Sequence, residues 1–187
     1  MMDQKKIQEL ISRSQKEDAV AFSLLVSTFQ PLVFRLAFRL LCDEDEAKDM
    51  VQETFVKVWL ALGKYNGECR FSTWIYKITC NTCYDRLRSL YHSPLDNEAD
   101  YSVSVNISSD DNVELAVVNK QLRELILRYT DELSPRQRLI FTLRDIEELD
   151  VPEVQTITGL SAGIIKTTLY LARKNIRNKM NQIDAGL

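Results

Sequence analysis

The most chemically suggestive part of the sequence is RFSTWIYKITCNTCYDRLRS, residues 70–89, which holds a Cys-x-x-Cys pair. The spacing of Cys80 and Cys83 is one found in zinc sites and in redox-active disulfides. A structural zinc site needs four ligands, usually as two spaced pairs, whereas the other cysteines and the only histidine are scattered at Cys42, Cys69 and His92. The pair also falls inside a helical pattern. We therefore expect free thiols, no metal and no cofactor.

The same stretch carries a second pattern when it is placed on a helix of 3.6 residues per turn, from about Phe71 to Leu90. One side holds core-type residues at positions 74, 75, 78 and 82. We call the other side the basic stripe, and its residues are Arg70, Thr73, Lys77, Asn81, Tyr84 and Arg88. Cations for phosphate, an amide for a base edge and a ring for stacking together suit single-stranded DNA. Taken alone, the stripe also fits a solvated polar helix face.

The helix before it, which begins at the capping-box pattern Asp43-x-x-Glu46, has a polar side of its own. We call this side the acidic face, and its residues are Asp49, Gln52, Glu53 and Val56. Its apolar side is an ordinary core stripe. An acidic, amide-bearing face beside a basic, aromatic one indicates two different partners on one lobe.

Nearly the whole chain has helical periodicity, with only 5 glycines and 4 prolines among 187 residues. Before the capping box, the pattern predicts one helix that ends near Pro31 and another from Val33 to Leu41. Residues 64–69 read as a loop. Residues 92–112 are polar, acidic and without helical period, which is typical of a flexible linker.

The segment 113–187 predicts a second helical lobe. Ser134-Pro135-x-Gln137 and Asp150-x-x-Glu153 are helix starts with capping boxes. Gly159-Leu160-Ser161 is a tight turn before a helix with a basic end, which is the pattern of a helix-turn-helix. The expected fold is all-α: a helical domain at 1–91, a linker at 92–112, and a helix-turn-helix domain at 113–187.

Composition fits a globular protein, with 45% hydrophobic and 27% charged residues. No apolar run approaches the roughly 18 residues of a membrane span, and the polar N-terminus is unlike a signal peptide. We expect a cytoplasmic protein without membrane insertion. The net charge of −3 argues weakly against nucleic acid, but the charge is uneven: residues 164–180 hold five basic residues and no acidic one.

These motifs resemble a known family. The run DEDEAKDMVQETFVKVW with RFSTWIYKITCNTCYDRLR resembles region two of bacterial sigma factors of the extracytoplasmic-function group. The run LSPRQRLIFTLRDIEELDVPEVQTITGLSAGIIKTTLYLARKNIR resembles their region four. The two resemblances span about Ala21 to Arg88 and Leu133 to Arg177, in the family's order.

The resemblance implies a transcription initiation factor, not an enzyme, that is a monomer when free. Its partners would be core RNA polymerase, through the β′ clamp helices and the β flap, promoter DNA, and an anti-sigma factor. The acidic face would bind the clamp helices. The basic stripe together with Trp74 would melt and read the minus-ten element by capturing a flipped base.

The family's second helix of the helix-turn-helix enters the major groove at the minus-thirty-five element. By resemblance, we call the corresponding residues here the recognition set: Ser161, Gly163, Lys166, Thr167, Tyr170, Arg173 and Lys174. The chain departs from the family by having Thr168, Tyr170 and Leu171 where arginine or a His-Arg pair is usual.

Two other classes of protein deserve comparison. A helix-turn-helix repressor or activator that acts without polymerase would leave the acidic face, Trp74 and Asn81 unexplained, and the sequence shows no added dimerisation element. An enzyme would need catalytic groups, but the chain has one histidine, no Gly-rich phosphate loop and no paired metal ligands. The sequence therefore favours a polymerase subunit.

Overall fold

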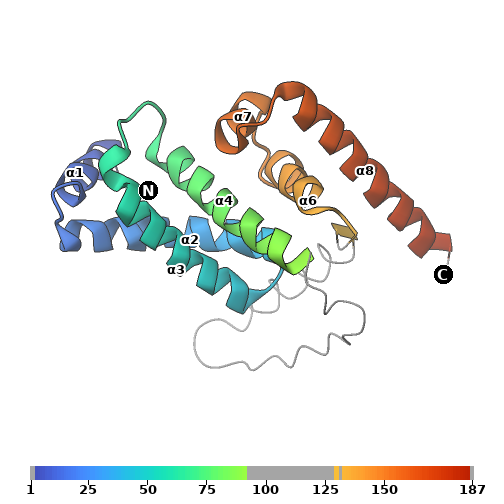
Figure 1. The fold of residues 1–187 in the computed structure, drawn as a ribbon, viewed down its shortest axis with the longest axis horizontal. Coiled ribbons are helices and arrows are strands. Elements are labelled where there is room, and N and C mark those ends of the chain that lie inside the picture. Colours follow the sequence, from blue (N-terminus) through green and yellow to red (C-terminus); the bar gives the residue numbers. More distant parts are fainter. Residues whose placement is uncertain (1–2, 92–128, 131, 186–187) are drawn as a thin grey trace.

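The structure, a computed structural model, describes residues 3–91, 129–130 and 132–185. Every regular element in these residues is helical, in two lobes that lie side by side (Figure 1). The N-terminal lobe comprises α1 (Gln4–Ser14), α2 (Ala19–Leu41), α3 (Glu44–Ala61), the 3-10 helix η1 (Leu62–Lys64) and α4 (Phe71–Tyr91). The C-terminal lobe comprises α6 (Pro135–Phe141), the π-helical turn η2 (Thr142–Ile146), α7 (Val151–Thr158) and α8 (Ala162–Ala185). The all-α prediction is confirmed; the predicted linker and the boundary at residue 113 lie outside the described residues.

The N-terminal lobe is built around α2, which packs against α1, α3 and α4. Aspartates cap the first three helices, because the carboxylates of Asp3, Asp18 and Asp43 accept hydrogen bonds from backbone amides of the first turn. The core between them is apolar and aromatic, with Leu25, Val58 and Ile75 almost completely buried. Helix α1 is not among the helices predicted from the sequence.

The predicted helix break near Pro31 is wrong, because α2 runs unbroken from Ala19 to Leu41. A proline inside a helix removes one backbone hydrogen bond and costs about 3 kcal/mol. Pro31 lies on the exposed side, where water can bond the carbonyl left free, and the opposite side buries Leu25, Val33 and Leu36. The free energy of burying that side offsets the cost of the proline.

The continuity of α2 also corrects the hydropathy analysis. At 23 residues, α2 is long and apolar enough by length and composition to cross a membrane, so the statement that no apolar run approaches a span is wrong. However, α2 carries Arg35 and Arg39, and its buried side contacts the other helices of its lobe. We therefore assign α2 as the core helix of the N-terminal lobe.

The helix starts and the turn of the C-terminal lobe are those that the sequence predicts. Both capping boxes are present, at Ser134 with Gln137 and at Asp150 with Glu153, and each of these helices has a proline in its first turn. Gly159 ends α7 with a left-handed φ of 72°, a conformation that glycine adopts without a Cβ penalty. The helix-turn-helix formed by α7 and α8 is confirmed.

The two lobes are in contact through α4, which packs on both α6 and α7 (Figure 1). One hydrophobic cluster is continuous across this contact, with members from α2, α3 and α4 and members from the C-terminal lobe such as Ile140, Leu143, Val154 and Ile165. Helix α8 packs on α6 and α7 and lies beyond them from α4. The basic stripe and the recognition set are therefore on different helices, with α6 and α7 between.

Candidate protein and nucleic-acid interfaces

The acidic face lies on the open side of α3. All four of its residues are exposed, with Val56 at 58%, and Leu60, one turn further along α3, is exposed at 75%. Exposed apolar side chains at the end of the acidic face indicate a protein partner whose surface is basic and apolar. Glu53 is not free, because its carboxylate pairs with Lys57 Nζ at 2.7 Å.

Two polar contacts hold α3 against α4 and so fix the acidic face relative to the basic stripe. Lys57 Nζ donates to Thr82 Oγ1 at 3.2 Å. Arg86 donates from Nε and Nη2 to the two carboxylate oxygens of Glu46, at 2.6 and 2.5 Å. The predicted capping box at Asp43 is thus half correct: Asp43 caps α3, but Glu46 turns to Arg86 instead. This hydrogen bond with Glu46 raises the pKa of Arg86.

The basic stripe follows one side of α4, as predicted. Arg70, Lys77, Asn81 and Arg88 are exposed, whereas Thr73 and Tyr84 are half-buried. Arg70 lies just before the helix, and its carbonyl accepts from Trp74 N at 3.0 Å. The stripe therefore presents cations at both ends and an exposed amide in the middle.

Trp74 is half-buried and belongs to an aromatic cluster at the start of α4. Its ring centroid is 5.2 Å from that of Tyr65 and 5.6 Å from that of Phe71. This cluster orients Trp74 and leaves part of its ring accessible. Beside it is a hollow of about 390 Å³ between α1 and the start of α4, lined by residues that include Ile7, Tyr65 and Arg70.

The cysteines are free thiols, as predicted, and those of the Cys-x-x-Cys pair are fully buried. Burial raises the pKa of Cys80 well above its ordinary value and that of Cys83 to about 12. Thiols with raised pKa values are poor nucleophiles and poor metal ligands. Within the described residues, no three Cys, His, Asp or Glu side chains form a group able to hold a metal ion.

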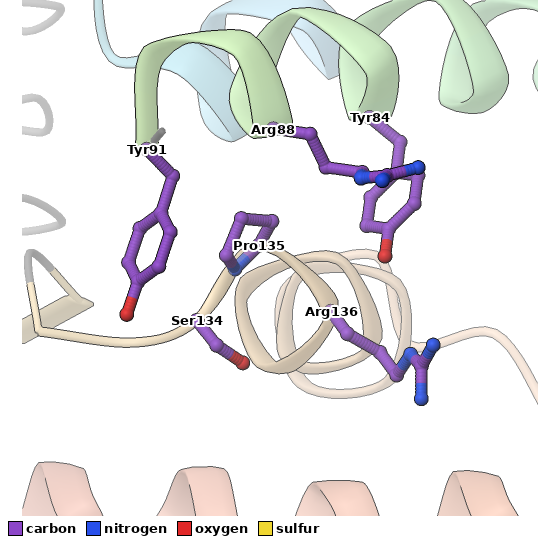
Figure 2. A pocket seen from close by; sticks show the side chains of 6 residues that line it. All are labelled: Tyr84, Arg88, Tyr91, Ser134, Pro135 and Arg136. Carbon is purple, nitrogen blue, oxygen red and sulfur yellow. The ribbon is translucent and has the colours of Figure 1, made fainter. Parts of the chain in front are cut away.

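A groove of about 290 Å³ crosses the contact between the lobes near the end of α4. Figure 2 shows Tyr84, Arg88 and Tyr91 projecting from α4 toward the start of α6, where Pro135 and Arg136 lie. The Arg88 guanidinium is 6.0 Å from the centre of the Tyr84 ring. The last two residues of the basic stripe therefore face the C-terminal lobe.

The recognition set lies along the exposed side of α8, opposite the buried Ile165, Leu169 and Ala172. Ser161 caps the helix, because its Oγ accepts from Ile164 N at 3.4 Å. The exposed residues of the set are Ser161, Gly163, Lys166, Thr167, Tyr170, Arg173 and Lys174. Within this set, Arg173 forms an ion pair: its guanidinium donates to both carboxylate oxygens of Asp145 at 2.8 and 2.5 Å.

Comparison with known proteins decides the family. Two family models match, Sigma-70 region 2 over residues 25–92 and Sigma-70, region 4 over residues 123–176. The ECF RNA polymerase sigma-E factor of Escherichia coli strain K12 is 31% identical over 189 residues, covering 98% of each chain. The chain belongs to the extracytoplasmic-function sigma factors. It is a promoter-specificity factor that binds RNA polymerase, and a regulator acting without polymerase is not favoured.

Other sigma factors are similar over nearly the same length. The RNA polymerase sigma-H factor of Pseudomonas aeruginosa strain PAO1 is 29% identical over 182 residues, with 94% of each chain covered. Among solved structures, CnrH bound to the cytosolic domain of CnrY has a TM-score of 0.66 at 20% identity, covering 96% of this chain and 99% of that one. The sigma factor RpoE from Bartonella quintana, bound to the anti-sigma factor NepR, has a TM-score of 0.60 at 21% identity, with 86% and 96% covered. These structures share the fold.

The residues that join the two lobes were not predicted from the sequence. Glu147, just after η2, contacts Tyr76 of α4 and Arg39 of α2. Arg136 and Tyr91, which line the groove between the lobes, were also missed. No local pattern marks these residues, because their partners come from elements distant in sequence.

Proposed function

We propose that this sigma factor divides its work among the three surfaces described above. The acidic face on α3 docks on the β′ clamp helices of core RNA polymerase. The basic stripe with Trp74 melts and reads the minus-ten element, and the recognition set on α8 reads the minus-thirty-five element in the major groove. The observation that carries the proposal is the acidic face, whose side chains project from a helix that two polar contacts with α4 hold in place.

For the minus-ten element, the support comes from the exposed Asn81. An amide offers both a donor and an acceptor, so it can hydrogen-bond the edge of an unpaired base. Lys77 and Arg88, exposed on the same side of α4, supply cations for the flanking phosphates. The hollow beside Arg70 and the accessible part of Trp74 offer a place for an unstacked base to enter.

For the minus-thirty-five element, the support is the exposure of Lys166, Thr167 and Tyr170 on the first turns of α8. Arg173 is held by Asp145, so we assign it to a phosphate within reach of that ion pair rather than to a base edge. With few cations free to contact bases, recognition by α8 depends largely on Lys166 and on apolar contacts with thymine methyl groups.

The remaining partners are proposed from the relatives. RpoE of Bartonella quintana was solved with an anti-sigma factor, and we propose that such a partner also regulates this chain. A contact of the C-terminal lobe with the β flap of polymerase is proposed from the family resemblance alone. Because polymerase works in the cytoplasm of bacteria, we place the protein there, as a monomer when it is free.

The direct test is association with core RNA polymerase. Asp49→Arg with Glu53→Arg should abolish co-elution with core polymerase in size-exclusion chromatography, since it reverses the charge of the docking face. The matched control is Glu9→Arg with Glu17→Arg, which makes the same charge change at exposed sites elsewhere on the lobe and should bind normally. Normal association of the first variant would contradict the assignment of this face.

A further inference from the structure

Glu147 is the most buried acidic side chain among the ion pairs of the described residues, at 7% exposure. Its Oε2 accepts a hydrogen bond from the Tyr76 hydroxyl of α4 at 2.5 Å, and its Oε1 pairs with the Arg39 guanidinium of α2. One carboxylate of the C-terminal lobe therefore bonds two helices of the N-terminal lobe. Burying a charge is costly unless it is paired and hydrogen-bonded, so these bonds exist only while the lobes remain together.

The backbone around Glu147 is unusual. The residue follows the π-helical turn η2, a rare geometry that often occurs at functional sites. The next residue, Glu148, has a left-handed φ of 57°, which costs a residue with a side chain about 1 kcal/mol or more. An ordinary α-helical continuation of α6 would aim position 147 elsewhere. The chain thus uses an unfavourable local conformation to place this carboxylate between α2 and α4.

We call the arrangement with the two lobes in contact the closed arrangement. It is incompatible with simultaneous binding of α4 and α8 to the two promoter elements. Helix axes pack about 8–10 Å apart, so α8, which is one helix layer beyond α6, lies roughly 20 Å from α4. The centres of the minus-ten and minus-thirty-five elements are separated by about 25 base pairs, or roughly 85 Å of duplex at about 3.4 Å per base pair. The lobes must therefore separate before α4 and α8 can each reach its element.

We infer that Glu147 is a latch: its bonds to Tyr76 and Arg39 hold the free sigma factor closed, and binding to core polymerase breaks them. The functional part of this inference rests on the proposed function. Opening leaves Glu147 hydrated and exposes apolar surface of the cluster that spans the lobes. The latch thus sets how much of the free protein is already open and competent for promoter binding.

The two buried cysteines report separately on opening and on unfolding. Cys80 lies one turn after Tyr76 and close enough to Glu147 for the carboxylate to affect its charge state, so it belongs to the contact between the lobes. Cys83 is instead close to Glu53 and Lys57 of α3, inside the N-terminal lobe. Both cysteines belong to the cluster that spans the lobes, but α3 lies against Cys83 through Glu53 and Lys57. Separation of the lobes therefore uncovers Cys80 more than Cys83, whereas unfolding of the N-terminal lobe uncovers both.

The experiment is site-resolved alkylation of the free protein with iodoacetamide, read by peptide mass spectrometry. In Tyr76→Phe, the rate at Cys80 should rise about tenfold, which corresponds to about 1.4 kcal/mol in the opening equilibrium, and the rate at Cys83 should rise less. Glu147→Gln should act in the same direction, but it also removes a negative charge near Cys80. Tyr76→Phe, which changes no charge, is therefore the decisive variant.

Glu148→Gln is the matched control, because it removes an exposed carboxylate at the neighbouring position and should leave both rates unchanged. Full protection of Cys80 in Tyr76→Phe, or an equal rise at Cys80 and Cys83, would overturn the latch. Core polymerase added to the unmodified protein should also raise the rate at Cys80, once chromatography has confirmed that the complex forms. Bound complex with Cys80 still protected would overturn the latch, whereas failure to form the complex would contradict only the proposed function.

Discussion

At the scale of single residues, helical periodicity predicted which side chains of α4 are exposed, but it did not predict which residues bond to one another. Lys77, Asn81 and Arg88 are exposed as predicted, since position on a known helix fixes which side faces outward. The partners of Glu147 could not be predicted, because Tyr76 and Arg39 precede it by 71 and 108 positions. Which distant residues meet depends on how α6 and α7 pack on α4, and a one-dimensional pattern does not contain that information.

The two DNA-binding assignments predict different defects. Asn81→Ala should impair opening of a duplex promoter and relax discrimination at one minus-ten position by about 1–3 kcal/mol. Transcription from matched duplex and pre-melted templates, with substitutions in each element, measures this effect. The control is Asn178→Ala, the same truncation at an exposed site on α8. A defect of Asn81→Ala confined to changes in the minus-thirty-five element would contradict the assignment.

Lys166→Ala should weaken engagement of the minus-thirty-five element and leave transcription from a pre-melted template nearly unchanged. If the contact is to a phosphate, affinity should fall for all sequences and the salt slope should fall by about one unit. Lys16→Ala, an exposed lysine of the N-terminal lobe, serves as control. Sensitivity of Lys166→Ala to changes in the melted region alone would show that the roles of the lobes are misassigned.

The buried thiol of Cys83 predicts a dependence of stability on pH. Its pKa is about 12 in the folded protein and 9.0 ordinarily, so its contribution is present below pH 9 and is lost as the pH rises toward 12. Between pH 8 and pH 11, this loss amounts to roughly 2 kcal/mol. In urea unfolding, Cys83→Ala should be less stable than the unmodified protein at pH 8, and the difference should shrink by pH 11. A difference in the free energy of unfolding that stays constant between pH 8 and pH 11 would exclude this origin.

At the scale of elements, the sequence predicted helix starts more reliably than helix continuity. Capping side chains act on neighbouring amides, so Ser134 and Asp150 could be recognised locally. The continuity of α2 through Pro31 could not, because it depends on burial against three other helices. Helix α1 was missed although its signals are local: Asp3 caps it, and Ile7, Leu10 and Ile11 have helical spacing.

Replacement of Pro31 tests that explanation of α2. Pro31→Ala should restore a backbone hydrogen bond on the exposed side and raise the free energy of unfolding by about 1–3 kcal/mol. Urea denaturation measures the change, with Gln30→Ala as the exposed neighbouring control. An unchanged or lower stability would mean that α2 is adapted to the proline.

Two glycines of the helix-turn-helix should respond in opposite directions. Gly159→Ala should destabilise the protein by about 1 kcal/mol, because φ is 72° there. Gly163→Ala should stabilise it by a similar amount, since the residue lies in α8 and no atom lies within 4 Å of an added Cβ. Thermal unfolding of both variants provides the comparison, and equal effects would contradict the turn geometry.

At the scale of the whole molecule, the family and the all-α fold followed from motifs at fixed spacing in two lobes, which the family models match separately. The contact between the lobes did not follow from them. Its apolar members, such as Ile140 and Val154, have the same helical spacing as residues that bury within a lobe. Periodicity identifies a buried side but not the element that covers it.

The central claim is that this chain gives core RNA polymerase its promoter specificity through the surfaces on α3, α4 and α8. The most direct test is transcription of fragmented genomic DNA by purified core polymerase with the chain, followed by sequencing of transcript 5′ ends. The account predicts new start sites that share one pair of sequence elements upstream and that disappear with Asp49→Arg/Glu53→Arg. Start sites identical to those of core polymerase alone, under conditions where the chain is folded, would contradict it.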